Sequence, residues 1–328
     1  MRITVDGVPC LRSPDSNFDD LTDFPYEPRY VEIDGLRMHY VDEGPTDAPV
    51  ALLVHGMPTW SFLYRRMLPP LLAAGFRCIA PDHMGFGRSD KVTDPDWYGI
   101  ARHSENLRRL VTELDLDDVT LFVQDWGGPI GLAQYAEMPE RFSRLVIMNT
   151  WLHHQEYEYS PGIRQWIGQN EPGGLFRENV PTKFGWGTLM AMATGRSNPQ
   201  DTLFAELNGG VGTYSVEAAA VRAAYNAPFV GLGDDGVVGT RRFPMSIPLV
   251  DPISGNADAQ SRHFEIVNRT SLPVHFVWGT NDNVFTLEWG RAWSARIPGS
   301  TWDEVPAGHF LQDTHGAEIV EIVLGRMA

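Results

Sequence analysis

The chain has 328 residues, of which 43% are hydrophobic and 21% are charged. This length and composition allow a large buried core and exclude a disordered chain. Acidic residues outnumber basic ones by 42 to 26, which gives a net charge of −16. Such a protein should repel nucleic-acid phosphates and anionic lipid head groups, so we expect a small-molecule ligand and neither a nucleic acid nor a membrane as partner.

The N-terminal segment, MRITVDGVPCLRSPD, lacks the basic start and the apolar run of a secretory signal. No later segment approaches the ~18 uninterrupted apolar residues of a membrane-spanning helix. The two cysteines, Cys10 and Cys78, do not form the pattern of a disulfide-rich secreted protein, so we expect free thiols. These features together predict a soluble cytoplasmic protein.

The first predicted structure is a β-hairpin over residues 29–42, with Asp34-Gly35 at its turn. From residue 48, short apolar runs alternate with helical periodicity, which predicts βα units around a mostly parallel sheet. The expected strands are APVALLVHG, RCIAPD, VTLFVQD, RLVIMNT, PVHFVWGTND and TWDEV, and the expected helices are SENLRRLVTELDL, PIGLAQYAEM and AEIVEIVLGRM.

Residues of roughly 152–240 interrupt this alternation with many aromatic residues, Gly/Pro clusters and weak helical segments. We predict that 152–240 form an inserted helical cap and that the core domain is discontinuous, built from residues 1–151 and 241–328. Two glycine-rich stretches in this region, at 208–212 and 231–239, neither follow a strand nor carry the lysine of a phosphate-binding loop. We predict that both are turns.

The segment VTLFVQDWGGPIGLAQYA runs from a buried strand through Asp125 directly into a helix, which is the setting of a nucleophile elbow. The serine of an esterase elbow is replaced by Asp125. A carboxylate near a helix N-terminus is ionised at neutral pH and can displace a leaving group from carbon, forming an alkyl ester. The alternative interpretation is that Asp125 only caps the helix.

Hydrolysis of such an ester needs a base, and His309 in PAGHFLQD follows the last expected strand. Asp282, directly after a buried strand, is the candidate acid that would orient His309 and stabilise its charged form, although it could also belong to a surface loop. Asn149 ends another strand but cannot supply a charge. Asp82 also ends a strand, and we expect it to fix a loop.

Adjacent His153 and His154 could suggest a metal site, but no further ligand stands at ligand spacing, so we expect no metal. The main-chain N–H groups of Met57 and Trp126 are expected to form an oxyanion hole. The indole of Trp126 can only donate a hydrogen bond, which suits a leaving anion. The alternative is an aromatic ring that simply packs under the cap.

Together, HGMPTWSFLYR, APDHMGFGRSDK, VQDWGGPIGL and PAGHFLQD resemble the haloalkane dehalogenases, through nearly all of the core and least in the cap. The resemblance implies an α/β-hydrolase fold with a mostly parallel central sheet, an N-terminal antiparallel hairpin and a helical cap. It implies Asp125 as nucleophile, His309 as base, Asp282 as acid and Trp126 as one of two halide-binding donors. The reactants would be a small hydrophobic halogenated compound and water, with no cofactor, metal or protein partner.

One position departs from the family, whose members usually carry Asn or Glu where this chain has Met57. Methionine cannot donate a hydrogen bond, so it cannot replace the asparagine that contacts halide in one branch. In the branch with glutamate, the second donor is a tryptophan of the cap. Trp166 and Trp186 are the candidates here, and we prefer Trp166.

Two alternatives to dehalogenation remain open at this stage. Epoxide hydrolysis would use the same Asp, His and acid, together with two cap tyrosines that stabilise the opening alkoxide. The available tyrosines are Tyr157, Tyr159, Tyr214 and Tyr225, but HGMPTW lacks the phenylalanine of the usual HGFP turn. The second alternative is a non-catalytic ligand-binding protein, against which three competent residues in the catalytic positions argue.

Overall fold

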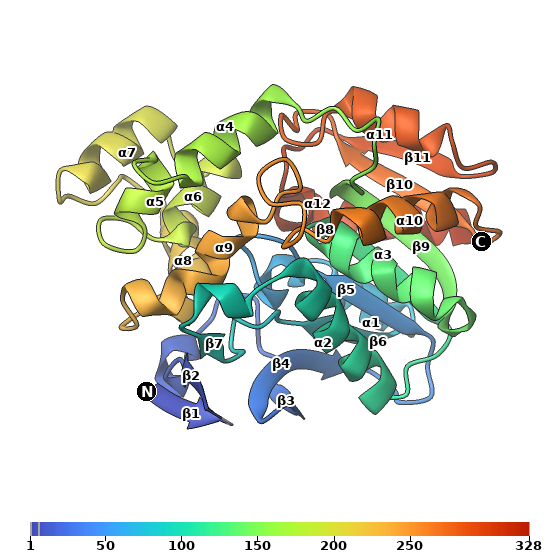
Figure 1. The fold of residues 1–328 in the computed structure, drawn as a ribbon, viewed down its shortest axis with the longest axis horizontal. Helices are drawn as coiled ribbons and strands as arrows, with labels where there is room; N and C mark the ends of the chain where they lie inside the picture. Colours follow the sequence, from blue (N-terminus) through green and yellow to red (C-terminus); the bar gives the residue numbers. More distant parts are fainter. Residues whose placement is uncertain (1, 6, 328) are drawn as a thin grey trace.

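The computed structural model describes residues 2–5 and 7–327. An eight-stranded sheet runs through the centre of the molecule in the order β11-β10-β9-β8-β5-β6-β4-β3 (Figure 1). Its strands are β3 (Arg29–Ile33), β4 (Leu36–Glu43), β5 (Val50–Val54), β6 (Arg77–Pro81), β8 (Val119–Asp125), β9 (Phe142–Thr150), β10 (Val274–Gly279) and β11 (Thr301–Val305). Six neighbouring strands of this sheet, β6, β5, β8, β9, β10 and β11, pair in parallel, so the predicted mostly parallel sheet is confirmed.

The predicted hairpin is confirmed as β3 paired antiparallel with β4, and β4 also pairs antiparallel with β6. Asp34 and Gly35 form its turn with φ angles of 51° and 75°. Two successive left-handed residues give the turn a twist that matches the strands, which explains the Asp-Gly dipeptide.

Both faces of the central sheet are buried. Along β5, Val50, Leu52 and Val54 belong to one hydrophobic cluster, whereas Ala51 and Leu53 belong to a second cluster. This two-sided burial explains why the parallel strands are continuous apolar runs in the sequence. The flanking helices of the core are α1 (Leu68–Ala73), α2 (Ile100–Glu113), α3 (Gly127–Glu137), α10 (Ala257–Asn268), α11 (Leu287–Ser294) and α12 (Leu311–Met327).

A separate three-stranded sheet near the N-terminus was not predicted. It consists of β1 (Arg2–Val5), β2 (Val8–Leu11) and β7 (Lys91–Val92), with β2 between the other two. Cys10 and Cys78 are buried and free, as expected. In the described part of the chain, no helix has the length and apolar character needed to cross a membrane.

The segment between β9 and α10 carries no strand among its described residues and forms a group of helices at one side of the molecule (Figure 1). They are α4 (Pro161–Asn170), α5 (Leu175–Asn179), α6 (Trp186–Ala193), α7 (Pro199–Leu207), α8 (Val216–Asn226) and α9 (Val238–Met245). The glycine-rich stretch 208–212 follows α7, and 231–239 leads into α9, so neither follows a strand. Helix α9 crosses the expected boundary at residue 240.

A buried ionic cluster joins these helices to the core. Asp313, on α12, accepts hydrogen bonds from Arg65 at 2.7 Å and from the hydroxyl of Tyr225 at 2.6 Å. Arg196, which follows α6, contacts the other carboxylate oxygen. Since Tyr225 lies on α8, a single core carboxylate contacts two separate parts of the helical segment.

Candidate active site

The strand, tight turn and helix predicted around Asp125 are present in the structure. Asp125 ends β8 with a left-handed φ of 51°, and α3 begins two residues later. The main chain is tightly packed here: a Cβ atom on Gly56 would clash with the Asp125 carboxylate, and one on Gly128 would clash with Thr150. Glycine at these positions therefore lets the strand, the turn and the helix approach one another closely.

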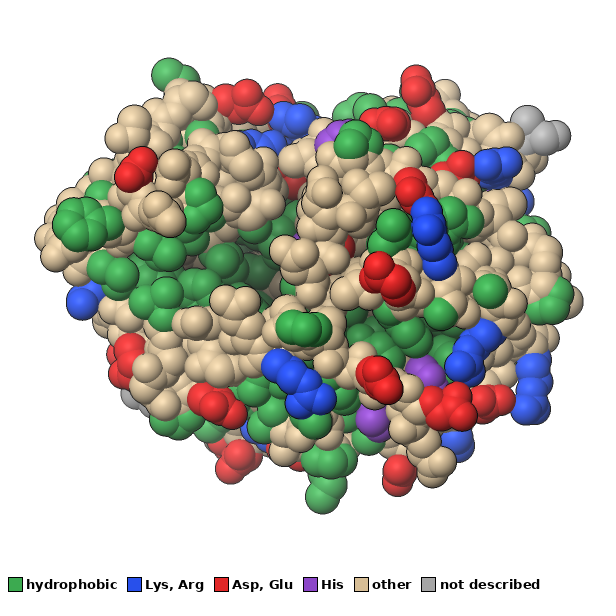
Figure 2. Space-filling model, turned by 90° about the horizontal axis from the view of Figure 1, so that it is seen from above, with side chains coloured by type: hydrophobic (Ala, Val, Ile, Leu, Met, Phe, Trp, Pro, Cys, Tyr) green, Lys and Arg blue, Asp and Glu red, His purple; other side chains and the backbone are tan. Residues whose placement is uncertain are grey.

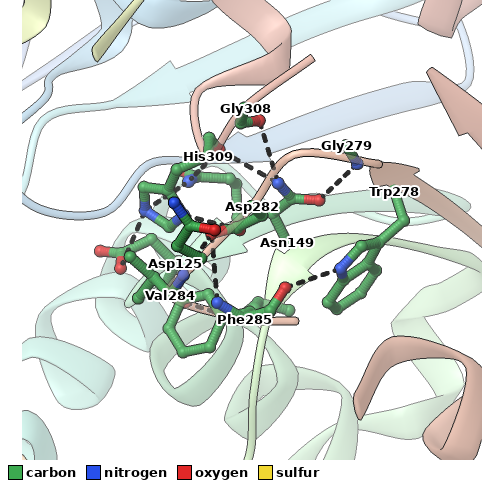
Figure 3. Close-up of polar contacts among 12 residues, drawn as sticks. Asp125, Asn149, Trp278, Gly279, Asp282, Val284, Phe285, Gly308 and His309 are labelled. Atoms are coloured by element: carbon green, nitrogen blue, oxygen red, sulfur yellow. Dashed lines mark hydrogen bonds and ion pairs between the residues drawn. The ribbon is translucent and has the colours of Figure 1, made fainter. Parts of the chain in front are cut away.

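The three residues predicted as a triad lie in contact (Figure 3). His309, in the loop between β11 and α12, has its Nδ1 2.9 Å from Asp282 Oδ2 and its Nε2 3.5 Å from Asp125 Oδ2. The other oxygen of Asp282 accepts hydrogen bonds from the main-chain N–H groups of Val284 at 2.7 Å and Phe285 at 3.2 Å. The Asp282 carboxylate is therefore held rigidly beside the imidazole.

Two carboxylates flank the imidazole and change its proton affinity. Burial lowers the pKa of His309, whereas attraction to Asp282 and the contact with Asp125 raise it, and the balance raises the pKa from 6.5 to about 10. The raised pKa favours the protonated, imidazolium form of His309 between the two carboxylates.

The main chain of Met57 also contacts Asp125, because its N–H donates to Asp125 Oδ1 at 2.7 Å. The main-chain N–H that was predicted to belong to an oxyanion hole therefore faces the Asp125 carboxylate. Trp126 directly precedes α3, and its side chain is buried beside Asp125.

Two small cavities meet at Asp125. One, of about 20 Å³, is lined by Asp125, Trp126, Trp151, Tyr159, Ile163, Trp166, Ile247, Val284 and Phe285. The other, of about 160 Å³, is lined by Met57, Pro58, Asp125, Trp166, Leu189, Ala193, Val284, His309 and Phe310. Most of the residues that line the two cavities are hydrophobic, and the lining of the larger one is mainly apolar, which suits a small hydrophobic ligand.

A larger hollow of about 590 Å³ is lined partly by α9 and does not include Asp125 or His309. We place the candidate site in the smaller cavities because they contain the carboxylate and the imidazole.

The surface of the molecule is hollowed on the side of the helical segment. Viewed from above, hydrophobic side chains gather in this hollow, and acidic and basic side chains are interspersed elsewhere on the face (Figure 2).

The structure distinguishes between the two candidate cap tryptophans. The indole N–H of Trp186 donates to Thr240 Oγ1 at 3.0 Å and is therefore occupied. Trp166 lines both cavities beside Asp125. This placement favours Trp166 as a donor to an anion in the cavity.

A third tryptophan of the small cavity, Trp151, was missed by the sequence analysis. Its ring stacks on Phe285 at 4.7 Å and meets Trp126 edge-on at 4.7 Å. Trp151 is buried, and among the described residues its indole N–H has no hydrogen-bond partner. The only signal in the sequence was its position just after the strand that ends at Asn149 and Thr150.

The four cap tyrosines do not form a free pair of hydroxyls above Asp125. The hydroxyl of Tyr225 contacts Asp313 at 2.6 Å, and that of Tyr214 donates to Glu206 at 3.0 Å. Tyr159 lines the small cavity, but its hydroxyl lies 2.9 Å from His153 Nδ1. The ring of Tyr157 packs edge-on against Trp289, at 4.7 Å.

Asn149 does not contact the imidazole but joins two loops of the site. Its side chain accepts a hydrogen bond from the main-chain N–H of Gly279 at 2.8 Å and donates to the carbonyl oxygen of Gly308 at 3.2 Å (Figure 3). Since Gly308 precedes His309, Asn149 helps to position the histidine loop without supplying a charge.

Asp82 fixes a loop, as expected. Its carboxylate accepts hydrogen bonds from the main-chain N–H groups of Ser61 at 2.7 Å and Arg88 at 2.8 Å, and lies 2.7 Å from His39 Nδ1. Burial raises the pKa of Asp82, but the contact with His39 and these hydrogen bonds outweigh burial and lower it overall.

Neither of the paired histidines His153 and His154 is among the residues that line the two cavities at Asp125. The ring of His154 stacks on Phe264 with 3.9 Å between the centroids. In the residues that the structure describes, no group of three or more His, Cys, Asp or Glu side chains is arranged to hold a metal ion.

Gln124 is a further residue of the site that the sequence analysis did not select. Its amide nitrogen lies 3.2 Å from His309 Nε2 and 3.1 Å from the His309 carbonyl oxygen. Its position next to Asp125 on a wholly buried strand was the available signal, since a polar side chain there requires a partner.

Comparison with known proteins identifies the class. Residues 49–316 match the family model described as alpha/beta hydrolase fold, and the chain belongs to this family. Curated haloalkane dehalogenases from Mycolicibacterium paratuberculosis and Psychrobacter cryohalolentis are 36% and 35% identical to the chain over 325 residues. These matches cover 96% of this chain and 97% and 96% of the two relatives.

A solved structure supports the same assignment. The tetrameric haloalkane dehalogenase from Paraglaciecola agarilytica superposes with a TM-score of 0.81 at 32% identity, covering 96% of this chain and 98% of the other. Within the α/β hydrolases, this chain therefore belongs to the haloalkane dehalogenase family. The resemblance inferred from the motifs is confirmed.

Proposed function

We propose that this protein hydrolyses the carbon–halogen bond of small haloalkanes through an ester on Asp125. The observation that carries the proposal is the position of the Asp125 carboxylate, which faces an apolar cavity lined by indoles and lies beside the His309–Asp282 pair. In this arrangement Asp125 is the nucleophile, His309 the base and Asp282 the acid that orients it.

In the first step, Asp125 attacks the carbon that bears the halogen. Since Oδ1 of Asp125 is held by the Met57 N–H, Oδ2 is the oxygen that forms the new bond to carbon. The carbon–halogen bond breaks, and the halide leaves with the bonding electron pair. We assign the indole N–H groups of Trp126 and Trp166 as its donors, because both rings line the cavity that contains Asp125.

In the second step, water attacks the carbonyl carbon of the Asp125 ester while His309 accepts a proton. The main-chain N–H groups of Met57 and Trp126 stabilise the negative charge that develops on the carbonyl oxygen. The alcohol leaves with a proton, which regenerates the carboxylate. The balance is one haloalkane and one water giving alcohol, halide and a proton.

The two steps are coupled through the charge of Asp125. Ester formation removes this charge, and with it one of the interactions that raise the pKa of His309. The imidazolium of the resting enzyme can then lose its proton and serve as the base.

We propose further that residues 152–240 form a cap over a core domain of residues 1–151 and 241–328. Trp166 and Leu189 of the cap line the cavities together with Asp125 and His309 of the core. An apolar site covered in this way limits the access of water before the ester has formed.

Epoxide hydrolysis by the same three residues is the nearest alternative. It requires free cap hydroxyls beside the opening ring, but those of Tyr159, Tyr214 and Tyr225 contact His153, Glu206 and Asp313. A ligand-binding protein without turnover is the other alternative, and it would bind haloalkanes without releasing halide.

Halide release from a panel of short bromoalkanes tests the proposal. The comparison is between the wild-type protein, Asp125→Asn and the exposed control Asp258→Asn, which makes the same chemical change on α10. We expect release by the wild type and the control and none above background by Asp125→Asn. A folded wild-type protein that converts epoxides but releases no halide would refute dehalogenation.

A further inference from the structure

We propose that Gln124 is a positioning residue for the second step, which holds the imidazole of His309 against β8 and favours its proton-accepting form. This inference rests on the proposed function. It assigns the hydrolysis of the ester, and not its formation, as the step that depends on the amide of Gln124.

The orientation of the amide follows from its neighbours. Gln124 is fully buried, and its amide nitrogen lies 3.1 Å from the His309 carbonyl oxygen and 3.2 Å from His309 Nε2. A carbonyl oxygen can only accept a hydrogen bond, so the NH₂ group, and not the amide oxygen, must face His309. One side chain thus contacts both the main chain and the ring of the proposed base.

An amide N–H that faces Nε2 can donate a hydrogen bond to the lone pair of a neutral imidazole. The same N–H repels a proton bound to Nε2, so it favours the neutral ring over the imidazolium. The charged groups in contact with the imidazole, Asp282 at Nδ1 and Asp125 near Nε2, both favour the imidazolium instead. When the ester forms, Asp125 becomes neutral. The amide of Gln124 is then a polar neighbour of Nε2 that favours the basic form.

The unpaired oxygen of Gln124 argues against a role in folding alone. Among the described residues, its Oε1 is buried and has no hydrogen-bond partner. A buried acceptor without a partner destabilises the folded state, and an apolar side chain of similar length would avoid this penalty. The stability of β8 therefore does not account for glutamine beside the nucleophile.

Two variants of the full-length protein test the proposal. Gln124→Met keeps the length of the side chain and removes the amide, whereas Gln124→Glu keeps the shape and replaces the NH₂ donor by a carboxylate oxygen. Rapid mixing of excess enzyme with a bromoalkane separates halide release, which reports ester formation, from alcohol formation, which reports ester hydrolysis. Both rates are measured as a function of pH.

For Gln124→Met, we expect the rate of halide release to stay within about two-fold of the wild type. The pH at which ester hydrolysis falls off on the acid side, the acid limb of its pH–rate profile, should move up by roughly 0.5 to 1 pH unit. Below that limb, hydrolysis should slow by about three- to ten-fold. For Gln124→Glu, we expect an upward shift at least as large, because a carboxylate stabilises the imidazolium.

A hydrolysis profile that superimposes on the wild type in both variants would overturn the inference. Equal slowing of both steps without a shifted limb would also overturn it, since that is the signature of a structural defect. If circular dichroism shows that Gln124→Met does not fold, the inference is tested with the isosteric Gln124→Glu variant alone, and the same two outcomes would overturn it. Absence of halide release from the wild type would instead refute the proposed function.

Discussion

The buried carboxylate of Asp313 should contribute strongly to the free energy of unfolding, because its ion pairs join the helical segment to the core. Replacing Asp313 by Asn keeps its size and its ability to accept a hydrogen bond from Tyr225. The substitution removes the negative charge that pairs with Arg65 and Arg196. Any loss of stability can then be assigned to the ion pairs and not to a cavity.

The expected magnitude follows from the burial of the partners. The side chains of Arg65 and Asp313 are both 0% exposed, and that of Arg196 is 12% exposed. Breaking a buried ion pair on one side leaves an uncompensated charge and destabilises a protein by about 3–5 kcal/mol. Because the guanidinium of Arg65 would remain wholly buried, we expect Asp313→Asn to fall within this range.

The free energy of unfolding is measured from urea denaturation followed by circular dichroism. The matched control is Glu265→Gln, whose partner Arg269 is 79% exposed, and it should cost less than about 0.5 kcal/mol because water screens the pair. A loss below about 1 kcal/mol for Asp313→Asn would show that the buried cluster is not held together by its charges, and would refute the reasoning.

Three further outcomes are expected. In a titration monitored by tryptophan fluorescence, Trp166→Phe should weaken halide binding by about ten-fold or more, whereas Trp186→Phe should change it by less than about two-fold. Equal effects would contradict the assignment of Trp166 as a halide donor. Burial lowers the pKa of His83 well below its ordinary value and that of His103 to about 3, so the unfolded chain binds more protons in acid. Stability should therefore be lost as the pH falls from about 6.5 towards 3, and an unchanged urea midpoint at pH 4 would exclude this contribution. Leu189→Ala should raise kcat/KM for 1-bromohexane relative to bromoethane, and an unchanged ratio would show that Leu189 does not limit chain length.

The parts of the fold that the sequence predicted are those in which burial leaves a regular signal. Strands buried on both faces are continuous apolar runs, and the chain turns that follow them carry the polar residues of the site. Asp125 could be predicted because it ends such a strand, and Asp282 because it follows one. His309 could be predicted from its place in the loop after the last expected strand. The structure brings the three side chains into contact, as this prediction requires.

The parts that were not predicted depend on long-range contacts. The sequence gives little reason to choose between Trp166 and Trp186. The structure separates them, because Trp166 lines both cavities and the indole of Trp186 donates to Thr240. A buried polar residue beside Asp125 is visible in the sequence, but the partner of Gln124 becomes known only when the loop of His309 is seen to lie against it. The sheet of β1, β2 and β7 was missed because its strands have two to four residues, too few for a visible alternation of polar and apolar positions.

The backbone conformation of Asp125 has a consequence for the evolution of this enzyme. A left-handed non-glycine residue costs on the order of 1–2 kcal/mol, and Asp125 adopts a φ of 51°. Glycine would relieve this strain but could not form the ester that we propose for Asp125. Selection for turnover therefore maintains a residue that selection for stability would replace, so a descendant released from the need to dehalogenate would be expected to lose Asp125 early.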